Sequence, residues 1–281
     1  MSEYGEAYQL GQADKYRNRQ RNHWKPRIEL AHNLVDRYAL PRLAGKKPEE
    51  MVVVDIGCSV GTFAIEFAKR GYRCYGVDSD PAALKVAKQL SAEEGVCPEF
   101  VLLNVADWRV KFPPIDIAVC FDLFEHLHDD ELGAFLQSLR KQIPPAGSLV
   151  FYTFPTQYDY LFFGRPVLRI PLFLVKFLPR RIFERVVRAY ASTIDTLLLL
   201  VKGHTYQGRI KHIGHCNPLT TDRLKDILER AGYEVLCLEV AQLYPFKAGI
   251  QKQFAKHPIS YRNLYGVAMP RATKGEGDAG V

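Results

Sequence analysis

The chain has 281 residues, with 38 Lys and Arg against 31 Asp and Glu, which gives a formal net charge of +7. At about 150 residues per domain, this length suits one large domain or a domain with an insertion, and it allows a sizeable core. Apolar residues at 47% and charged residues at 25% are the balance of a globular protein and exclude a disordered, collagen-like or coiled-coil chain.

The cysteines and the apolar runs indicate the cellular compartment in which the protein is expected. The six cysteines are scattered without a CxxC pair, and we interpret them as reduced thiols. Residues 1–27 contain no apolar signal region, and a run of about 18 apolar residues, as needed for a membrane span, does not occur. We therefore expect a cytoplasmic protein, with association to a membrane surface left open by the basic segment described below.

Helical spacing of apolar residues first occurs over residues 28–43, and alternating strand and helix patterns follow. The predicted strands are 51–56, 73–77, 99–103, 115–121 and 148–153, and the predicted helices between them are 61–69, 80–94 and 129–142. The pattern stops at Pro155 and resumes with a helix over 222–231. Two last strands, 234–240 and 263–268, predict an antiparallel edge.

About 60 residues, 156–217, separate the fifth predicted strand from the last helix, which is too many for an ordinary loop. We interpret them as a cap over the ligand end of the sheet. The predicted fold class is α/β, with a doubly wound, mostly parallel seven-stranded sheet, helices on both faces and a mainly helical cap insertion.

A glycine-containing turn, G-C-S-V-G-T, follows the first predicted strand. Gly57 allows a tight turn and the close approach of a ligand, and Gly61 allows close helix packing. Asp78 ends the second strand, where an acid can accept both hydroxyls of a ribose. A dinucleotide site would need G-x-G-x-x-G, and Asp55 would face its pyrophosphate. The pattern therefore favours a ligand with an amino group and no phosphate.

D-I-G-C-S-V-G, followed by V-D-S-D, resembles motif I and the next acidic motif of class I S-adenosylmethionine-dependent methyltransferases. The resemblance covers residues 50–155 and 217–270. It implies that S-adenosylmethionine is the cofactor, with its methionine part held by the loop and Asp55 and its ribose held by Asp78. The cofactor-binding residues implied are Asp55, Gly57, Cys58, Ser59, Gly61, Asp78, Ser79, Asn104, Val105, Asp107 and Phe121.

Two features of this sequence bear on the resemblance, namely Asn104 and the polar N-terminal segment. The family often has an acid where Asn104 stands, and Asp107 can supply one instead. The polar N-terminus can close over the cofactor, with Tyr16, Trp24 and Arg27 as candidates. The expected segments are a helical cofactor-covering segment 1–45, a methyltransferase core 46–156 and 218–270, a basic and apolar cap 157–217, and a disordered tail 271–281.

A second group of polar residues follows the fourth predicted strand, in F-D-L-F-E-H-L. If this segment is helical, Asp122, Glu125 and His126 share one face. The pattern acid-x-x-E-H with a later histidine, His215 in K-H-I-G-H, resembles metal-dependent O-methyltransferases of ubiquinone biosynthesis and of small-RNA 2′-O-methylation. In this sequence Asp122 replaces the more usual Glu.

The resemblance implies a divalent metal ion that lowers the pKa of a hydroxyl. Its ligands would be Asp122, Glu125, His126 and His215, a set suited to Mg²⁺, Zn²⁺ or Fe²⁺. Without a metal, His126 or His215 is the candidate general base. The catalytic candidates are therefore Glu125, His126 and His215.

The excess positive charge lies in one part of the chain. Residues 159–211 contain ten Lys and Arg and three acids, and the rest of the chain is neutral. Such a segment can dock on an anionic membrane, bind a soluble anionic substrate, bind RNA or form a solvated cap face. RNA is less favoured, because no aromatic residues interleave with the basic ones as a stacking platform requires.

These observations favour O-methylation of a small hydroxyl-bearing molecule, lipophilic or anionic, with S-adenosylmethionine as the methyl donor. The expected partners are this small-molecule substrate and, through residues 159–211, a membrane surface. The alternatives are an RNA 2′-O-methyltransferase and a non-catalytic S-adenosylmethionine-binding protein.

Overall fold

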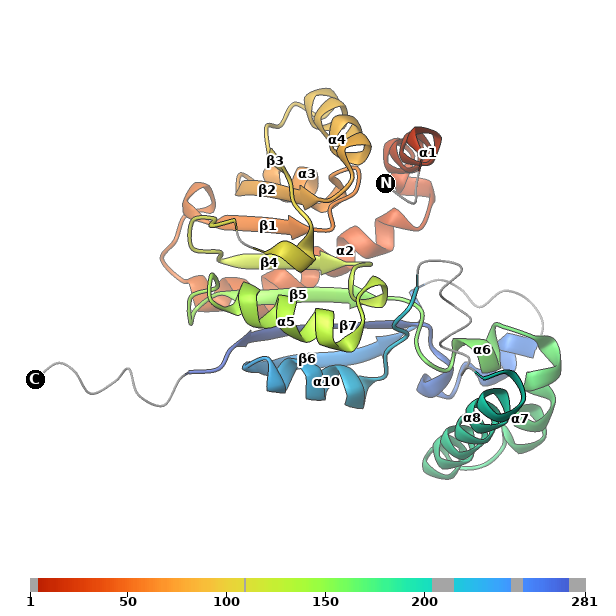
Figure 1. Cartoon of the computed structure of the whole chain (residues 1–281). Coiled ribbons are helices and arrows are strands. Elements are labelled where there is room, and N and C mark those ends of the chain that lie inside the picture. Colours follow the sequence, from red (N-terminus) through yellow and green to blue (C-terminus); the bar gives the residue numbers. More distant parts are fainter. Residues whose placement is uncertain (1–4, 109, 204–214, 244–249, 273–281) are drawn as a thin grey trace, which may run out of the picture.

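The computed structural model describes residues 5–108, 110–203, 215–243 and 250–272. A seven-stranded sheet in the order β3-β2-β1-β4-β5-β7-β6 forms its centre (Figure 1). The strands are β1 Val52–Ile56, β2 Arg73–Asp78, β3 Glu99–Leu102, β4 Ile117–Phe121, β5 Ser148–Thr153, β6 Tyr233–Ala241 and β7 Asn263–Pro270.

Strands β1 to β5 are parallel, whereas β7 is antiparallel to both of its neighbours, β5 and β6. The predicted α/β class and seven strands are confirmed, and the sheet is mixed because β7 runs against the others. β1, β4 and β5 are buried along their whole length, as expected of central parallel strands covered on both faces.

Helices cover both faces of the sheet. α5 and α10 pack on one face, and α2 and α3 pack on the other. Side chains of β1 alternate accordingly, because Val52 and Val54 face α5 and α10 while Val53 faces α2. The α-helices are α1 Glu6–Arg17, α2 Trp24–Leu34, α3 Thr62–Ala68, α4 Pro81–Glu93, α5 Asp129–Arg140, α6 Asp159–Phe162, α7 Arg169–Val175, α8 Arg180–Lys202 and α10 Thr221–Arg230.

The helix predicted over residues 28–43 is less regular than its spacing indicated. It begins four residues earlier, at Trp24, and after Leu34 it continues as a π turn, Val35–Ala39, and a 3₁₀ turn, Leu40–Leu43. Pro41 lies in the 3₁₀ turn, where it cannot donate a backbone hydrogen bond to a continuing α-helix.

Helices α6, α7 and α8 form the cap, which lies beyond the carboxyl end of β5 (Figure 1). The segment between β6 and β7, which we assigned to the core from the sequence, contributes to the cap: the His257 ring stacks on Phe183 at 3.9 Å between ring centroids. The apolar cluster of the cap includes Tyr160, Leu172, Phe183, Val187, Phe254 and Ile259. The last part of the chain, including most of the predicted tail 271–281, lies outside the described residues.

No helix in the described part of the chain combines the length and the apolar character needed to cross a membrane.

Two glycines at the ligand end of the sheet make room for one aromatic ring. A Cβ atom added at Gly76 would lie 2.6 Å from Phe100 Cδ1, and one added at Gly61 would lie 2.8 Å from Phe100 Cε1. Gly61 also has a φ of 80°, which favours glycine. The ring of Phe100 therefore packs directly against the backbone of β2 and of the loop that follows β1.

We predict that Gly76→Ala lowers the free energy of unfolding by about 1–3 kcal/mol, because the added methyl group overpacks the contact with Phe100. Gly133→Ala is the matched control, since an added Cβ there meets no atom within 4 Å. In the interior of α5 it should stabilise by about 0.5–1 kcal/mol. Denaturant unfolding measures both, and equal effects of the two substitutions would contradict the prediction.

Candidate active site

A cavity of about 560 Å³ lies at the carboxyl ends of β1, β2 and β4. This volume is within the range of small-molecule sites, about 300–1,000 Å³. Its walls come from the loop after β1, the end of β2, the segments after β3 and β4, and helices α1 and α2. The residues that follow these strands lie close together because parallel strands have their carboxyl ends at the same edge of the sheet.

The loop after β1 is held against the end of β2 by backbone hydrogen bonds. The N–H groups of Gly57 and Cys58 both donate to the carbonyl of Val77, at 2.8 and 2.9 Å. The Ser59 N–H donates to Asp78 Oδ2 at 2.7 Å. Gly57 has a φ of 74°, so the turn suits a glycine. The loop therefore presents its backbone edge to the cavity in one fixed conformation.

Asp78 ends β2 and lines the cavity. Its carboxylate accepts the N–H groups of Ser59 and Asp80, at 2.7 and 2.9 Å. Burial raises the pKa of Asp78 above its ordinary value. Eight of the predicted cofactor-binding residues line the cavity, namely Gly57, Cys58, Ser59, Asp78, Ser79, Asn104, Val105 and Phe121.

The other three predicted cofactor-binding residues, Asp55, Gly61 and Asp107, are not among the residues that line the cavity. Asp55 is buried, and its carboxylate accepts the Ala64 N–H at the start of α3, at 3.0 Å. Burial raises the pKa of Asp55 to about 7. Asp55 thus ties the glycine loop to α3, and its contact with the cofactor stays a prediction.

The N-terminal segment forms one wall of the cavity. In α1, the buried Gln9 donates to Asp80 Oδ2 at 2.8 Å and accepts from the Ser59 hydroxyl at 3.2 Å. Of the three candidates from the sequence, Trp24 and Arg27 line the cavity. Tyr16 is buried outside it and donates to Glu66 at 2.6 Å. Sequence reasoning missed Gln9, because an isolated polar residue in a polar stretch gives no signal.

The segment after β4 is not the α-helix that would place Asp122, Glu125 and His126 on one helical face. Asp122 has a φ of 55°, and only a short 3₁₀ turn, Phe124–His126, follows it. The condition for a shared helical face is therefore not met. The turn nevertheless directs Glu125 and His126 into the cavity, and Asp122 also lines it.

His215 lies beside this turn although it is 89 residues later in the chain. The ring centroids of His126 and His215 are 4.9 Å apart. Ligand atoms of Glu125, His126 and His215 lie within 4.8 Å of one another. Asp122 is not part of this group, and its Oδ2 accepts from Arg27 Nη1 at 2.5 Å.

Asn217 explains how His215 reaches this position. Its N–H donates to the carbonyl of Glu125 at 2.9 Å, and its side-chain amide donates to the carbonyl of Leu127 at 2.8 Å. Asn217 is fully buried. It therefore anchors the returning chain to the turn after β4, and no pattern in the sequence marked it. Residues 211–214 of the K-H-I-G-H stretch lie outside the described part.

The surroundings of Glu125 and His215 favour the neutral forms of these two side chains. Burial, followed by the nearby charge of Asp122, raises the pKa of Glu125 well above its ordinary value. Glu125 Oε2 accepts from the Thr153 hydroxyl at 2.8 Å, and its buried Oε1 has no hydrogen-bond partner among the described residues. Burial, with a smaller contribution from the charge of His126, lowers the pKa of His215 to about 4. His215 therefore offers a neutral imidazole at physiological pH.

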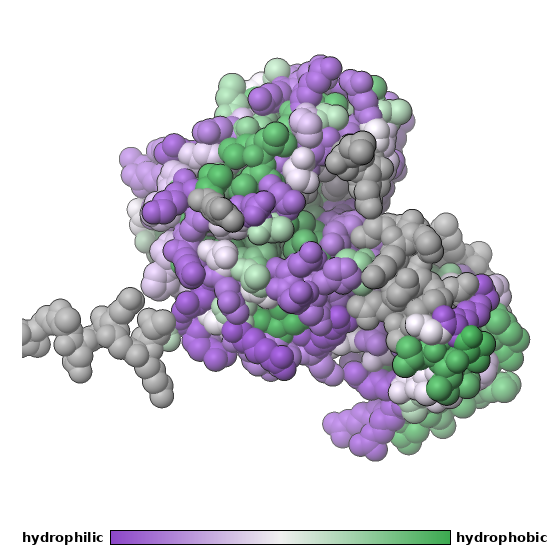
Figure 2. Space-filling model, in the orientation of Figure 1, coloured by the Kyte–Doolittle hydropathy of each residue, from purple (hydrophilic) through white to green (hydrophobic). Residues whose placement is uncertain are grey.

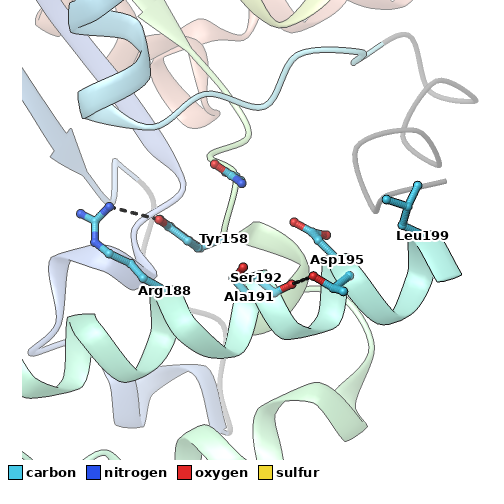
Figure 3. A pocket seen from close by; sticks show the side chains of 8 residues that line it. Tyr158, Arg188, Ala191, Ser192, Asp195 and Leu199 are labelled. Atoms are coloured by element: carbon cyan, nitrogen blue, oxygen red, sulfur yellow. Dashed lines mark hydrogen bonds between the residues drawn. The ribbon is translucent and has the colours of Figure 1, made fainter.

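A second cavity, of about 270 Å³, lies between α8 and the segment after β5 (Figure 3). Arg188 donates to the Tyr158 hydroxyl at its edge, at 3.3 Å. None of the site residues predicted from the sequence is among the residues that line it. We therefore place the candidate chemistry in the larger cavity.

The chain is similar to known proteins in sequence and in fold. A ubiquinone biosynthesis O-methyltransferase of Chromobacterium violaceum is 32% identical over 125 residues, 44% of this chain and 50% of that protein. One of Pseudomonas fluorescens is 26% identical over 181 residues, 60% of this chain and 72% of that protein. The chain thus spans about half the length of the first of these relatives.

Among solved structures, an S-adenosylmethionine-dependent methyltransferase from Clostridium acetobutylicum superimposes with a TM-score of 0.56 over 94% of this chain and 98% of its own, at 8% identity. A TehB-like methyltransferase from Corynebacterium glutamicum gives 0.52 over 95% and 100%, at 15% identity. These likenesses show the fold. Residues 29–238 match the family model described as a methyltransferase domain. The resemblance expected from the glycine loop is confirmed, and the chain belongs to the methyltransferase domain family.

Proposed function

We propose that this protein transfers the methyl group of S-adenosylmethionine to a hydroxyl of a small lipophilic molecule. One observation carries the proposal. The same cavity has Asp78 and the glycine loop on one side and the group of Glu125, His126 and His215 on the other. An edge that can hold a nucleoside therefore lies next to two imidazole rings that can accept a proton.

The cavity fits the cofactor on several counts. A Cβ atom at Gly57 would lie 3.2 Å from Leu123 Cδ1, and the φ of 74° there favours glycine, which leaves the backbone edge of the loop without a side chain. The buried Thr62 hydroxyl lines the cavity without a hydrogen-bond partner among the described residues. We assign the ribose hydroxyls to Asp78 and the carboxylate of the methionine part to the positive side chain of Arg27.

For this reaction the protein must align the methyl group with the acceptor hydroxyl and must remove the hydroxyl proton. S-adenosylmethionine supplies a methyl group on a positive sulfur, so a bond forms between the acceptor oxygen and the methyl carbon while the carbon–sulfur bond breaks. In the absence of a bound cation, the neutral ring of His215 accepts the hydroxyl proton. The aromatic walls exclude water and hold the oxygen in line with the methyl carbon.

The walls of the cavity favour an apolar acceptor. Trp24, Phe63, Phe121 and Phe154 line it, and Arg27 is the one Lys or Arg among its described lining residues. An RNA 2′-O-methyltransferase would need cations for phosphates, so this alternative is not favoured. A binding protein without catalysis would not need His126 and His215 side by side.

We also propose a divalent cation in the same cavity, held by Glu125, His126 and His215. One carboxylate and two imidazoles are a common set of ligands for such ions, and Glu125 Oε1 has no other partner among the described residues. When bound, the cation would lower the pKa of the acceptor hydroxyl. Asp122 is left out of this set because Arg27 binds its carboxylate.

The function is tested by incubating the protein with S-adenosylmethionine that carries an isotopically labelled methyl group and with lipid-soluble phenols. Mass spectrometry should find the label in a methyl ether. His215→Ala should slow this transfer by about 10²–10⁴-fold, the usual contribution of a general base, and should leave S-adenosylhomocysteine affinity unchanged. His128→Asn is the control, because it removes an exposed imidazole and keeps a side chain that caps α5. Label on nitrogen or carbon, or full activity of His215→Ala, would overturn the assignment.

Asp78→Ala should weaken the binding of S-adenosylhomocysteine at least about 100-fold, because hydrogen bonds to a charged acceptor contribute about 1.5–3 kcal/mol each. Asp107→Ala is the matched control, since Asp107 lies nearby and does not line the cavity. Isothermal titration calorimetry measures both affinities. Weaker binding by Asp107→Ala, with Asp78→Ala unchanged, would place the ribose elsewhere.

Removal of metal with a chelator should lower activity, and Mg²⁺, Zn²⁺ or Fe²⁺ should restore it. Metal content per chain, measured by plasma mass spectrometry, should fall in Glu125→Gln and persist in Asp122→Asn. The proposed cation is wrong if the purified protein binds none of these ions and keeps its activity in the chelator. His215 would then act as a base alone.

A further inference from the structure

The cap exposes apolar side chains to an extent not seen elsewhere on the described residues. Residues 167–201 contain ten large apolar side chains that are exposed, whereas the rest of the described chain exposes only Tyr8, Leu10 and Leu102 in this way. Figure 2 shows the hydrophobic colour gathered over the cap helices. We define the cap apolar face by Val167, Ile170, Phe173, Leu174, Phe177 and Ile182.

This face follows from the two sides of α7. Leu172 points into the apolar cluster of the cap and is 1% exposed. Ile170 and Leu174 recur at the spacing of one helical face, and Phe177, in the turn after α7, is 84% exposed. A helix that is apolar on both sides belongs between two apolar environments. The cap cluster is one of them, so the outer side lacks its second environment.

The segment that carries this face is basic. Residues 160–183 contain five Lys and Arg and no Asp or Glu. The ammonium of Lys176 lies 4.0 Å from the ring centroid of Phe173 and 4.8 Å from that of Phe177. Arg165 and Arg181 are exposed beside the face. Basic side chains next to exposed aromatic and aliphatic ones are suited to the boundary between lipid headgroups and acyl chains.

We propose that the cap apolar face docks on the surface of a lipid bilayer that contains anionic lipids. Its apolar side chains enter the headgroup boundary, and Arg165, Lys176 and Arg181 contact lipid phosphates. A second copy of the chain fits this face less well, because two such faces would bring their positive charges together. Soluble acidic ligands would satisfy the cations and leave the apolar side chains in water.

Docking would also place the active site near the lipid. The chain leaves the cavity wall at Phe154 to form the cap and returns to it at His215, and both residues line the cavity. A lipophilic acceptor could then reach the cavity from the bilayer without crossing bulk water. This consequence rests on the proposed function, whereas docking itself does not.

Flotation of the full chain with vesicles tests the proposal without any measurement of activity. The protein should float with vesicles of phosphatidylcholine mixed with phosphatidylglycerol and much less with phosphatidylcholine alone. Binding should weaken at high salt, because the Debye length falls to about 3 Å at 1 M. Leu174→Ser combined with Phe177→Ser should reduce partitioning at least about tenfold, because each side chain loses the burial of an apolar group.

Matched controls separate docking from general effects. Leu102→Ser replaces an apolar side chain that is 59% exposed outside the cap, and it should float like the unchanged protein. Arg181→Glu should weaken binding to anionic vesicles, whereas Lys88→Glu in α4 makes the same charge change away from the face and should have little effect. Thermal unfolding of each variant verifies that it is folded.

Three results would overturn the proposal. One is the absence of flotation with anionic vesicles. Another is equal flotation of Leu174→Ser/Phe177→Ser and Leu102→Ser. The third is a dimer in sedimentation velocity that Leu174→Ser/Phe177→Ser dissociates, without vesicle binding, which would make the face an interface between two chains.

Discussion

The site depends on how this fold accommodates four acidic side chains at the carboxyl edge of its parallel strands. A carboxylate removed from water needs a cation or hydrogen-bond donors. Backbone N–H groups donate hydrogen bonds to Asp55 from the start of α3 and to Asp78 from the glycine loop. Arg27 of α2 donates to Asp122, and a hydroxyl of β5 donates to Glu125. Each hydrogen-bond donor comes from a different element. The hydrogen bonds to these four acids therefore hold together the elements that surround the cavity.

These pairings also divide the cavity into two chemical halves. Asp55 and Asp78 fix the backbone of the glycine loop, and that half has the hydrogen-bonding edge a nucleoside needs. In the other half, Glu125 keeps one oxygen without a partner among the described residues, next to the neutral ring of His215. Methyl transfer needs alignment, a proton acceptor and the exclusion of water more than it needs strong acids or bases. The chain enters the cap after Phe154 and returns from it at His215, and both residues line this cavity. The cap that we propose to meet lipid is therefore attached to the walls of the active site.

Short-range sequence patterns predicted the features that depend on residues close together in the chain. Apolar periodicity predicted the strands, and the glycine turn with Asp78 predicted residues that the structure brings to one cavity. Contacts between distant segments could not be predicted: Gln9 reaches Asp80 across 71 residues, and Asn217 anchors the chain beside Glu125. The conformation of Asp122 was missed for a related reason. Its left-handed φ is held by tertiary contacts, and its residue type allows a helix just as well.

The central claim is that one cavity holds S-adenosylmethionine with its reacting end against Glu125, His126 and His215. A crystal structure of the protein with S-adenosylhomocysteine tests this most directly. The account predicts ribose hydroxyls on the carboxylate of Asp78 and the thioether sulfur facing the two histidine rings. A nucleoside bound away from Asp78, or a sulfur on the side of the cavity remote from the histidines, would contradict it.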